Sequence, residues 1–232
     1  MTADRSPFDA WPWRTLAVAV LLAGGVLMWH PHRPPVAEAP VPPPTSAEIS
    51  AAARRLVATP VGQALEIRFP GASREIAEAQ LRDGAAAGRA AAWRLRQVAL
   101  VTASDPLLDQ HASLMRVALA AALDASPSWC SSLLDGTLDT ATVMPSEWRR
   151  ADETFAVLLL SAPPRRDRPL RPGAAYRSLL PAMAALTPEQ QRLLGDPRAG
   201  RARCEAWRTW YDTVARLPTT PRRLALRAAL QR

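Results

Sequence analysis

Apolar residues recur at helical spacing over most of the chain after residue 45, and hardly any stretch alternates as a β-strand would. Stripes with a period of three or four residues indicate amphipathic helices. The clearest stripes are Leu107–His111–Leu114–Ala118–Ala121, Trp148–Ala151–Phe155–Leu158–Ala162 and Cys204–Trp207–Tyr211–Val214. The pattern therefore predicts an all-α domain over residues 45–232, a compact bundle of about six to eight helices.

The stretch from Ile76 to Thr102 predicts the longest helix of this domain. Small and apolar residues recur there at coiled-coil spacing, and Gly84 and Gly88 would allow another backbone to approach closely. A glycine within a helix costs up to about 1 kcal/mol relative to alanine. The two glycines therefore also weaken the helix that they belong to.

Helix-start signals recur along the same region. Thr45 and Glu48 have the spacing of a capping box, and six further sites place a residue that can cap a helix before a proline, which tolerates the first helical turn. These six sites are Thr59–Pro60, Asp105–Pro106, Ser126–Pro127, Thr187–Pro188, Asp196–Pro197 and Thr220–Pro221. Each predicts the beginning of a helix.

Leu16 to Met28 form an uncharged apolar run. Fifteen helical residues rise only about 22 Å, which is less than the roughly 30 Å of hydrocarbon in a bilayer. Tryptophans on both sides extend the span to about 28 Å and suit the membrane interface. The pattern predicts a single transmembrane signal anchor over residues 15–30. The residues expected at the membrane interface are Trp11, Trp13, Arg14 and Trp29.

The alternatives to an anchor are a cleaved secretory signal and a buried helix. Ala37-Glu38-Ala39 is the best candidate cleavage site, but it lies far from the run and Pro40 would follow the cut. Two arginines precede the run and one follows it closely, which favours a cytoplasmic segment 1–14 and a periplasmic remainder. The segment 31–44 contains seven prolines and predicts an extended linker. We therefore expect a single-pass protein of the inner membrane.

The net charge is +8, and all 29 basic residues are arginine, a bias typical of GC-rich genomes. Residues 101–162 hold 3 arginines and 8 acidic residues, whereas residues 163–232 hold 15 arginines and 5 acidic residues. Either these two parts pack together and pair their charges, or the basic end binds an anionic lipid, polymer or protein surface. No nucleic-acid-reading motif is recognisable, so nucleic acid is not an expected partner.

Two basic segments are candidate partner-binding regions. The arginine- and proline-rich stretch from Pro163 to Pro172 predicts an exposed loop, which either docks on an acidic surface or stays solvated. The stretch from Thr220 to Arg232 predicts a basic amphipathic helix that caps the domain, with membrane or partner docking as the alternative. The candidate partner-binding residues are Arg165, Arg166, Arg168, Arg171, Arg222, Arg223 and Arg227.

Cys130 and Cys204 are the two cysteines of the chain, and neither belongs to a CxxC motif. Two cysteines this far apart in the sequence do not match the motifs of a zinc site or of a redox-active dithiol. In an oxidising compartment the pair predicts one structural disulfide, which would contribute roughly 4 kcal/mol by constraining the unfolded chain. The alternative is a pair of buried free thiols.

Catalytic signatures are weak. GxSxG and SxxK motifs are absent, as is a phosphate-binding loop with its lysine. His111 is the one histidine after residue 45, and its apolar stripe predicts a core position. Glu147, Asp152 and Glu153 form the one local carboxylate cluster, but neighbouring residues of a helix point in different directions. We therefore expect no catalytic, cofactor-binding or metal-binding residues.

These patterns together predict a membrane-anchored periplasmic protein. Its expected role is that of an interaction, scaffolding, assembly or folding-assistance factor in the bacterial envelope, with the membrane and an envelope protein as partners. An anionic lipid or polymer contact is compatible with its basic end. The alternative function is a periplasmic cell-wall enzyme that cleaves glycan with the carboxylates of the acidic segment.

Overall fold

The computed structural model describes residues 42–165 and 172–230. Within these ranges the chain contains helices and no β-strand, which confirms the all-α prediction. None of the helices in the described ranges is long and apolar enough to cross a membrane. The predicted anchor over residues 15–30 and most of the linker lie outside the described residues. So do the predicted site residues Trp11, Trp13, Arg14, Trp29, Arg166, Arg168 and Arg171.

The described residues form twelve helices, more than the roughly six to eight that the apolar pattern predicts. The difference arises because one predicted helix is divided and because three helices have eight residues or fewer. In chain order the helices are α2 (Ser46–Val57), α3 (Pro60–Arg68), α4 (Ala72–Asp83), α5 (Ala85–Val101), α6 (Asp105–Ala125), α7 (Pro127–Leu134), α8 (Thr140–Val143), α9 (Ser146–Ser161), α10 (Pro172–Met183), α11 (Pro188–Leu193), α12 (Gly200–Arg216) and α13 (Thr219–Leu230).

Six of the seven predicted start signals lie at or next to the beginning of a helix. The backbone N–H of Thr45 donates to the Glu48 carboxylate at 2.8 Å, and the Thr45 hydroxyl accepts from the Glu48 N–H at 3.3 Å, which completes the capping box. The signal at Asp196–Pro197 is wrong, because α12 begins only at Gly200. Asp196 closes a turn instead, since its carboxylate accepts from the backbone N–H of Arg198 at 2.9 Å.

The prediction of one continuous helix from Ile76 to Thr102 is also wrong. Gly84 has φ +90° and ψ 172°, a conformation that is essentially restricted to glycine, and it separates α4 from α5. The chain turns there, and α5 packs against α4. A Cβ atom on Gly88 would lie only 2.8 Å from Cβ of Gln80. The glycine does permit a close approach, but it does so between these two consecutive helices.

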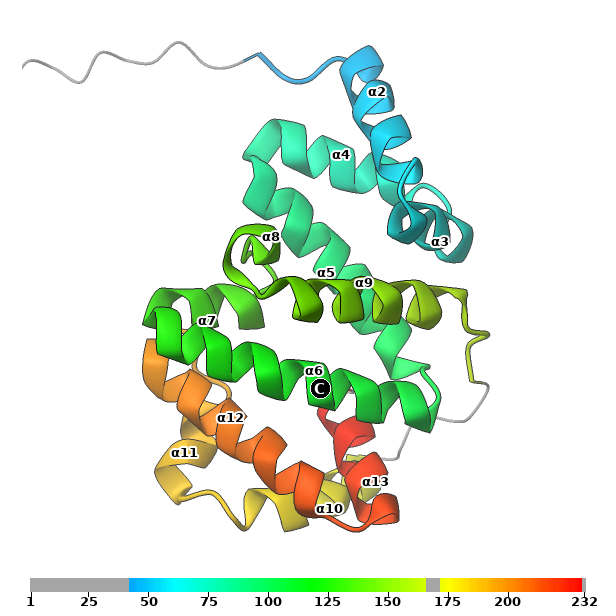
Figure 1. Ribbon diagram of the computed structural model, residues 1–232. Coiled ribbons are helices and arrows are strands. Elements are labelled where there is room, and N and C mark those ends of the chain that lie inside the picture. The colour runs from blue at the N-terminus through cyan, green and yellow to red at the C-terminus, as the bar shows by residue number, and fades with distance from the viewer. Residues whose placement is uncertain (1–41, 166–171, 231–232) are drawn as a thin grey trace, which may run out of the picture. The chain divides into compact units, whose positions relative to one another are not determined.

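Helix α6 is central to the packing, because it contacts α7, α9, α12 and α13. Figure 1 shows α6 and α9 running beside each other, with α5 passing behind them. The buried face of α6 includes Leu108, Met115, Leu119 and Ala122, each at most 5% exposed. Burying a leucine or methionine side chain contributes about 1.5–3 kcal/mol. This apolar face therefore supplies a large share of the core that positions α12 and α13.

The predicted disulfide is present. Cys130 of α7 and Cys204 of α12 are bonded, with their Cα atoms 6.0 Å apart, and neither residue is exposed. Among the described residues there is no free cysteine. The alternative of two buried free thiols is therefore excluded in this structure, and the bridge fixes α12 to α7.

Candidate functional site

A cavity of about 350 Å³ lies between α5, α6, α12 and α13. Aromatic rings form much of its wall, and aliphatic side chains from α6 and α13 complete it. The aromatic residues are Trp93, Trp207, Trp210 and Tyr211, and the residues from α13 are Leu226, Ala229 and Leu230. We call this space the aromatic cavity. Some of the side chains that line it are separated by more than a hundred positions in the sequence.

The rings of α12 gather because residues three and four positions apart share one face of a helix. The centroids of Trp207 and Trp210 are 5.4 Å apart and those of Trp210 and Tyr211 are 5.0 Å apart, both in edge-to-face geometry. Such pairs stabilise each other beyond their burial. The indole N–H of Trp207 also donates to the backbone oxygen of Leu194 at 3.1 Å. This wall is therefore a packed and oriented aromatic surface.

His111 lines the cavity from α6 and is only 3% exposed. Its ring stacks on Phe155 with a centroid distance of 6.0 Å and meets the edge of Tyr211 at 6.5 Å. Its Nδ1 atom is buried and has no hydrogen-bond partner among the described residues. Leaving a buried polar atom unpaired costs about 1–3 kcal/mol. The core position predicted for His111 is correct, but the polar partner usual for a core histidine is missing.

The imidazole of His111 is neutral. Burial, reinforced by the positive charge of Arg96, lowers its pKa to about 3. A neutral imidazole has one nitrogen that donates and one that accepts. Burial raises the pKa of Tyr211 in turn, so that its phenol stays protonated. At physiological pH the two side chains thus offer hydrogen-bond donors and acceptors without a charge.

Two further polar groups border the cavity without being fully paired. Arg203 donates through Nη1 to the Asp135 carboxylate at 3.0 Å, yet its Nε is buried and has no partner in the described part of the chain. Gln97 also lines the cavity, and no hydrogen bond among the described residues involves its side-chain amide or the Tyr211 hydroxyl. The aromatic wall therefore includes polar side chains that are not fully hydrogen-bonded within the described residues.

Trp93 is positioned from behind by a glycine and an arginine. Gly136 has φ +70°, and a Cβ atom there would lie 2.2 Å from Cγ of Trp93, so that the indole rests directly on the backbone. Arg96 lies over the ring of Trp93 at 5.6 Å and over that of Phe155 at 5.0 Å. Its Nη1 donates to the Asp152 carboxylate at 3.0 Å. These contacts fix both Trp93 and the ring on which His111 stacks.

A cluster of charged residues fastens α13 against the start of α6. We call it the charge cluster, and its members are Asp105, Asp109, Arg165, Arg222, Arg223 and Arg227. Arg222 Nε lies 2.9 Å from Asp109 Oδ1, and Arg165 donates to Asp105 at 2.9 Å. Arg227 donates both to Asp105 and to the backbone oxygen of Ala103, the latter at 3.1 Å. The cluster thereby holds one wall of the aromatic cavity in place.

The arginines of the cluster also set the ionisation of Asp105. Burial by itself would raise the pKa of this carboxyl. The hydrogen bond from Arg227 and the positive charges of Arg227, Arg165 and Arg223 together outweigh burial, and the pKa lies below its ordinary value. Asp105 is therefore a carboxylate at neutral pH.

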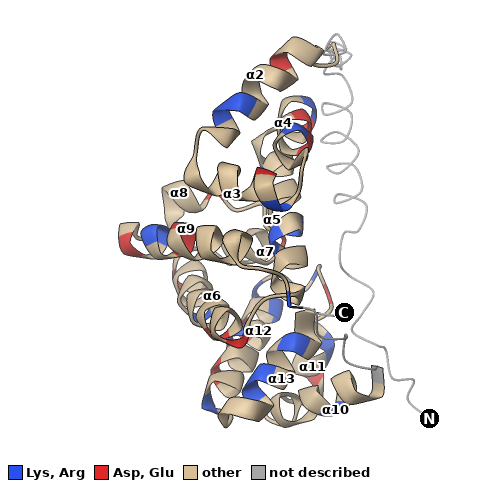
Figure 2. Cartoon of the chain, turned by 90° about the vertical axis from the view of Figure 1, so that its right-hand side faces the viewer, with Lys and Arg blue, Asp and Glu red and all other residues tan. Residues whose placement is uncertain are grey.

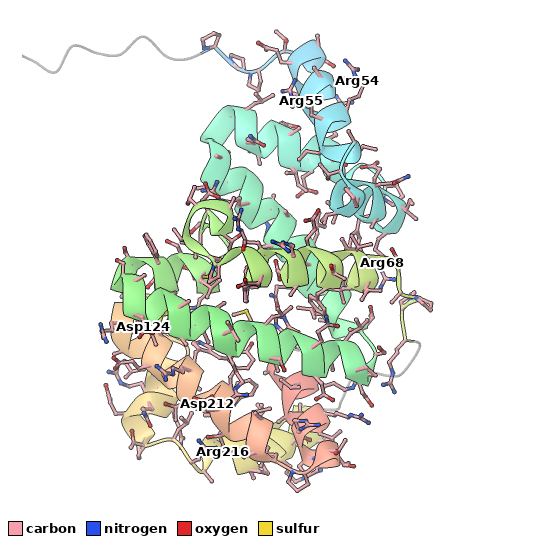
Figure 3. The ribbon with its side chains drawn as sticks, in the orientation of Figure 1. Arg54, Arg55, Arg68, Asp124, Asp212 and Arg216 are labelled. Atoms are coloured by element: carbon pink, nitrogen blue, oxygen red, sulfur yellow. A yellow bond between two sulfur atoms is a disulfide. The ribbon has the colours of Figure 1, made fainter. Side chains whose placement is uncertain are left out.

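The predicted pairing of the acidic and basic parts of the chain is confirmed by these contacts. Figure 2 shows basic segments on α12 and α13 and acidic ones on α6. One ion pair has the basic residue on α6 and the acidic residue on α12: Arg116 pairs with Asp212 at 2.9 Å. Asp212 is labelled in Figure 3. Partner binding by the predicted arginines stays a prediction. Four of them, Arg165, Arg222, Arg223 and Arg227, have partners within the chain.

The carboxylates considered for glycan cleavage do not converge. Asp152 is paired with Arg96, whereas Glu147 and Glu153 are exposed on α9. Among the described residues, no group of three His, Cys, Asp or Glu side chains is placed to hold a metal ion. No protein family, curated protein or solved structure matches this chain. The aromatic cavity is the feature whose geometry best supports a function.

Sequence reasoning missed this cavity as a site. It did recognise the α12 stripe that contains Trp207 and Tyr211, and the dense aromatic composition of that helix was the available signal. Nothing near Gln97 or Trp93 in the sequence indicated that α5 would face α12. Arg203 entered the sequence analysis only as one of the 15 arginines of residues 163–232.

Proposed function

We propose that this chain is a tethered binding domain of the bacterial cell envelope, which recognises a small ligand in the aromatic cavity. The observation that carries the proposal is the buried imidazole of His111, unpaired among aromatic walls. Small-molecule sites are typically preformed apolar cavities with a few polar groups that orient the ligand. A ligand that pairs with the imidazole of His111 would make a hydrogen bond that the empty protein lacks.

The way in which the cavity is framed supports recognition. The disulfide fastens α12 through Cys204, and the charge cluster fastens α13 through Arg222, Arg223 and Arg227. A site whose walls are held in place loses less conformational entropy when the ligand binds. These ion pairs give a structural role to four of the predicted partner-binding arginines, Arg165, Arg222, Arg223 and Arg227. Arg166, Arg168 and Arg171 of the proline-rich segment are left as the candidates for contact with an envelope partner.

The amino-terminal part of the chain supports a location at the membrane. An apolar run with interfacial tryptophans precedes the domain, and the proline-rich linker of residues 31–44 would span about 40 Å at roughly 3 Å per residue. In this proposal the anchor keeps the domain on the periplasmic face of the inner membrane. There it senses or carries a small molecule for an assembly or scaffolding task.

A ligand-release experiment tests the binding function. Full-length protein is purified from its native cells, denatured, and analysed by mass spectrometry for released small molecules. Ala229→Phe places a ring into the cavity, and Ala86→Phe makes the same change on an exposed part of α5. We expect a stoichiometric small molecule from the natural protein and from Ala86→Phe, and none from Ala229→Phe. Absence of a released molecule from the natural protein, or equal release from Ala229→Phe, would overturn the proposal.

The location is tested separately. Protease added to spheroplasts should remove the helical domain from the membrane fraction while a cytoplasmic marker stays intact. A domain that is cleaved only after lysis would contradict the periplasmic placement, and a domain found in the soluble fraction would contradict the anchor.

A further inference from the structure

The aromatic cavity is partly open to solvent, and its volume indicates the size of ring system that it can hold. A dry protein cavity of about 150 Å³ is large enough for one benzene ring. The aromatic cavity measures about 350 Å³, a little more than twice that volume. Its walls include Trp207 and Trp210 at an interplanar angle of 75°, so that one ring offers its edge where the other offers its face. Both orientations suit the offset and edge contacts of a planar aromatic ligand. Two fused rings with a small substituent match this space.

The charges around the cavity limit the ligand further. No Asp or Glu lines the cavity, whereas Arg203 does, so a cationic ligand would meet a like charge without a counter-ion. An anionic ligand would also lack a counter-ion, because the positive charge of Arg203 is already paired with Asp135. Transferring an uncompensated charge out of water is far more costly than transferring a hydrogen-bonded polar group. A neutral ligand fits this environment.

The polar groups specify what a neutral ligand should carry. The guanidinium of Arg203 can only donate, whereas His111, Tyr211 and Gln97 each can donate and accept. An oxygen on the ligand can accept from Arg203 or from one of the other three, and a hydroxyl can in addition donate to the free imidazole nitrogen. Because all four side chains can donate, an acceptor on the ligand is the minimum requirement.

We infer that the aromatic cavity binds a neutral, planar ligand of two fused aromatic rings that carries an oxygen acceptor, as a naphthol does. This inference rests on the proposed binding function and names its ligand class. His111 is the residue that recognises the oxygen of the ligand, and Ala229 lies where an added side chain closes the cavity.

Calorimetric titration of the full-length protein with four probes of one ring system tests the inference. The probes are 1-naphthol, naphthalene, 1-naphthoate and 1-naphthylmethylammonium. We expect 1-naphthol to bind with one site per chain and naphthalene to bind about fivefold more weakly, as loss of one hydrogen bond implies. Both ions should bind at least about tenfold more weakly than 1-naphthol, since they carry a charge into the cavity. An affinity for either ion equal to that for 1-naphthol would overturn the inference.

Two variants locate the site. His111→Phe keeps a ring that can stack on Phe155 but removes both nitrogens, so the affinity for 1-naphthol should fall about fivefold while that for naphthalene is unchanged. The thermal midpoint of this variant should not fall, because an unpaired buried polar group has been removed. Ala229→Phe should abolish binding of both compounds, and Ala86→Phe should abolish neither. Unchanged 1-naphthol binding in His111→Phe would refute the role of the imidazole.

The failure of this inference is distinguishable from failure of the proposed function. If no probe binds but a different small molecule is released from the purified protein, the ligand class is wrong and the binding function stands. If no probe binds and no molecule is released, both are wrong.

Discussion

Arg227 of α13 donates a hydrogen bond to the carboxylate of Asp105 in the first turn of α6, across 122 positions of sequence. Asp105 also accepts from Arg165, which follows the end of α9. One carboxylate therefore connects three separate parts of the chain. Because α13 forms a wall of the aromatic cavity, the ionisation of Asp105 affects both the stability of the fold and the shape of the site.

Asp105→Asn should lower the free energy of unfolding at pH 7 by about 2 kcal/mol, since charge-assisted hydrogen bonds are lost and arginines are left facing one another. The matched control is Asp124→Asn on the same helix. Asp124 is exposed near the other end of α6, as Figure 3 shows, and has no ion pair among the described residues. The control should change stability by less than about 0.5 kcal/mol. Denaturant-induced unfolding measures both.

Acid should remove this contribution. The pKa of Asp105 is lowered in the folded protein, so its stabilisation is fully present above the ordinary carboxyl pKa of about 4 and is lost as the pH falls through the folded-state value. The difference in unfolding free energy between the natural protein and Asp105→Asn should therefore shrink from pH 5 toward pH 2. A difference that stays constant over this range would show that Asp105 does not act through its charge.

Replacing both Cys130 and Cys204 by alanine should lower the free energy of unfolding by roughly 4 kcal/mol, because the unfolded chain is no longer constrained over a loop of this length. Alkylation provides the direct measurement. Without reductant, neither cysteine should be labelled even in denaturant, whereas both should be labelled after reduction. Labelling of the unreduced protein would mean that the bond does not form in the cell.

Gly84→Ala should destabilise the domain by about 1–3 kcal/mol, since alanine rarely adopts φ near +90°. Gly195→Ala is the control, because a Cβ atom at Gly195 meets nothing within 4 Å. Its effect should stay within about 0.5 kcal/mol. If the two variants unfold at the same denaturant concentration, the break between α4 and α5 does not depend on glycine.

Gly136→Ala should have a larger effect, more than about 2 kcal/mol, because the added Cβ would overlap Trp93 and the backbone would be strained as well. Trp93 must then move, and binding of 1-naphthol should weaken with it. Gly173→Ala is the control, since the nearest atom to its Cβ would lie 3.7 Å away. Calorimetric titration and thermal unfolding check the two effects. A full-affinity Gly136→Ala protein would show that Trp93 does not shape the cavity.

The features that the sequence predicted well depend on local physics. The capping box at Thr45 is satisfied within four residues, and the apolar face of α12 follows from a periodicity that any helix imposes. The disulfide was predictable because only two cysteines were available. The stripe on α9 was placed less well, since Leu158 is 50% exposed while Leu159 and Leu160 are buried. A face defined by two or three positions can shift by one residue when the neighbouring helices decide which side is covered.

The cavity was not predictable for a different reason. Its walls come from helices whose contact depends on tertiary packing. From the sequence alone, a tryptophan such as Trp93 is predicted to be an ordinary core residue. The break at Gly84 was uncertain for a related reason, because a glycine is tolerated within a helix at a cost of about 1 kcal/mol. Only the packing of α5 on α4 decides between the two conformations. The same holds for His111, whose apolar stripe correctly indicates burial but says nothing of a missing partner.

The bond between Cys130 and Cys204 also makes a covalent ring of the 74 positions that separate them, and this ring contains the whole of α8, α9, α10 and α11. A protease that cuts once anywhere inside the ring leaves two fragments that remain one molecule. The amino-terminal fragment keeps the proposed membrane segment and α6, and the carboxy-terminal fragment keeps α12 and α13. The carboxy-terminal fragment of the cleaved protein would therefore stay attached to the amino-terminal fragment, and to the proposed anchor, until a reductant released it.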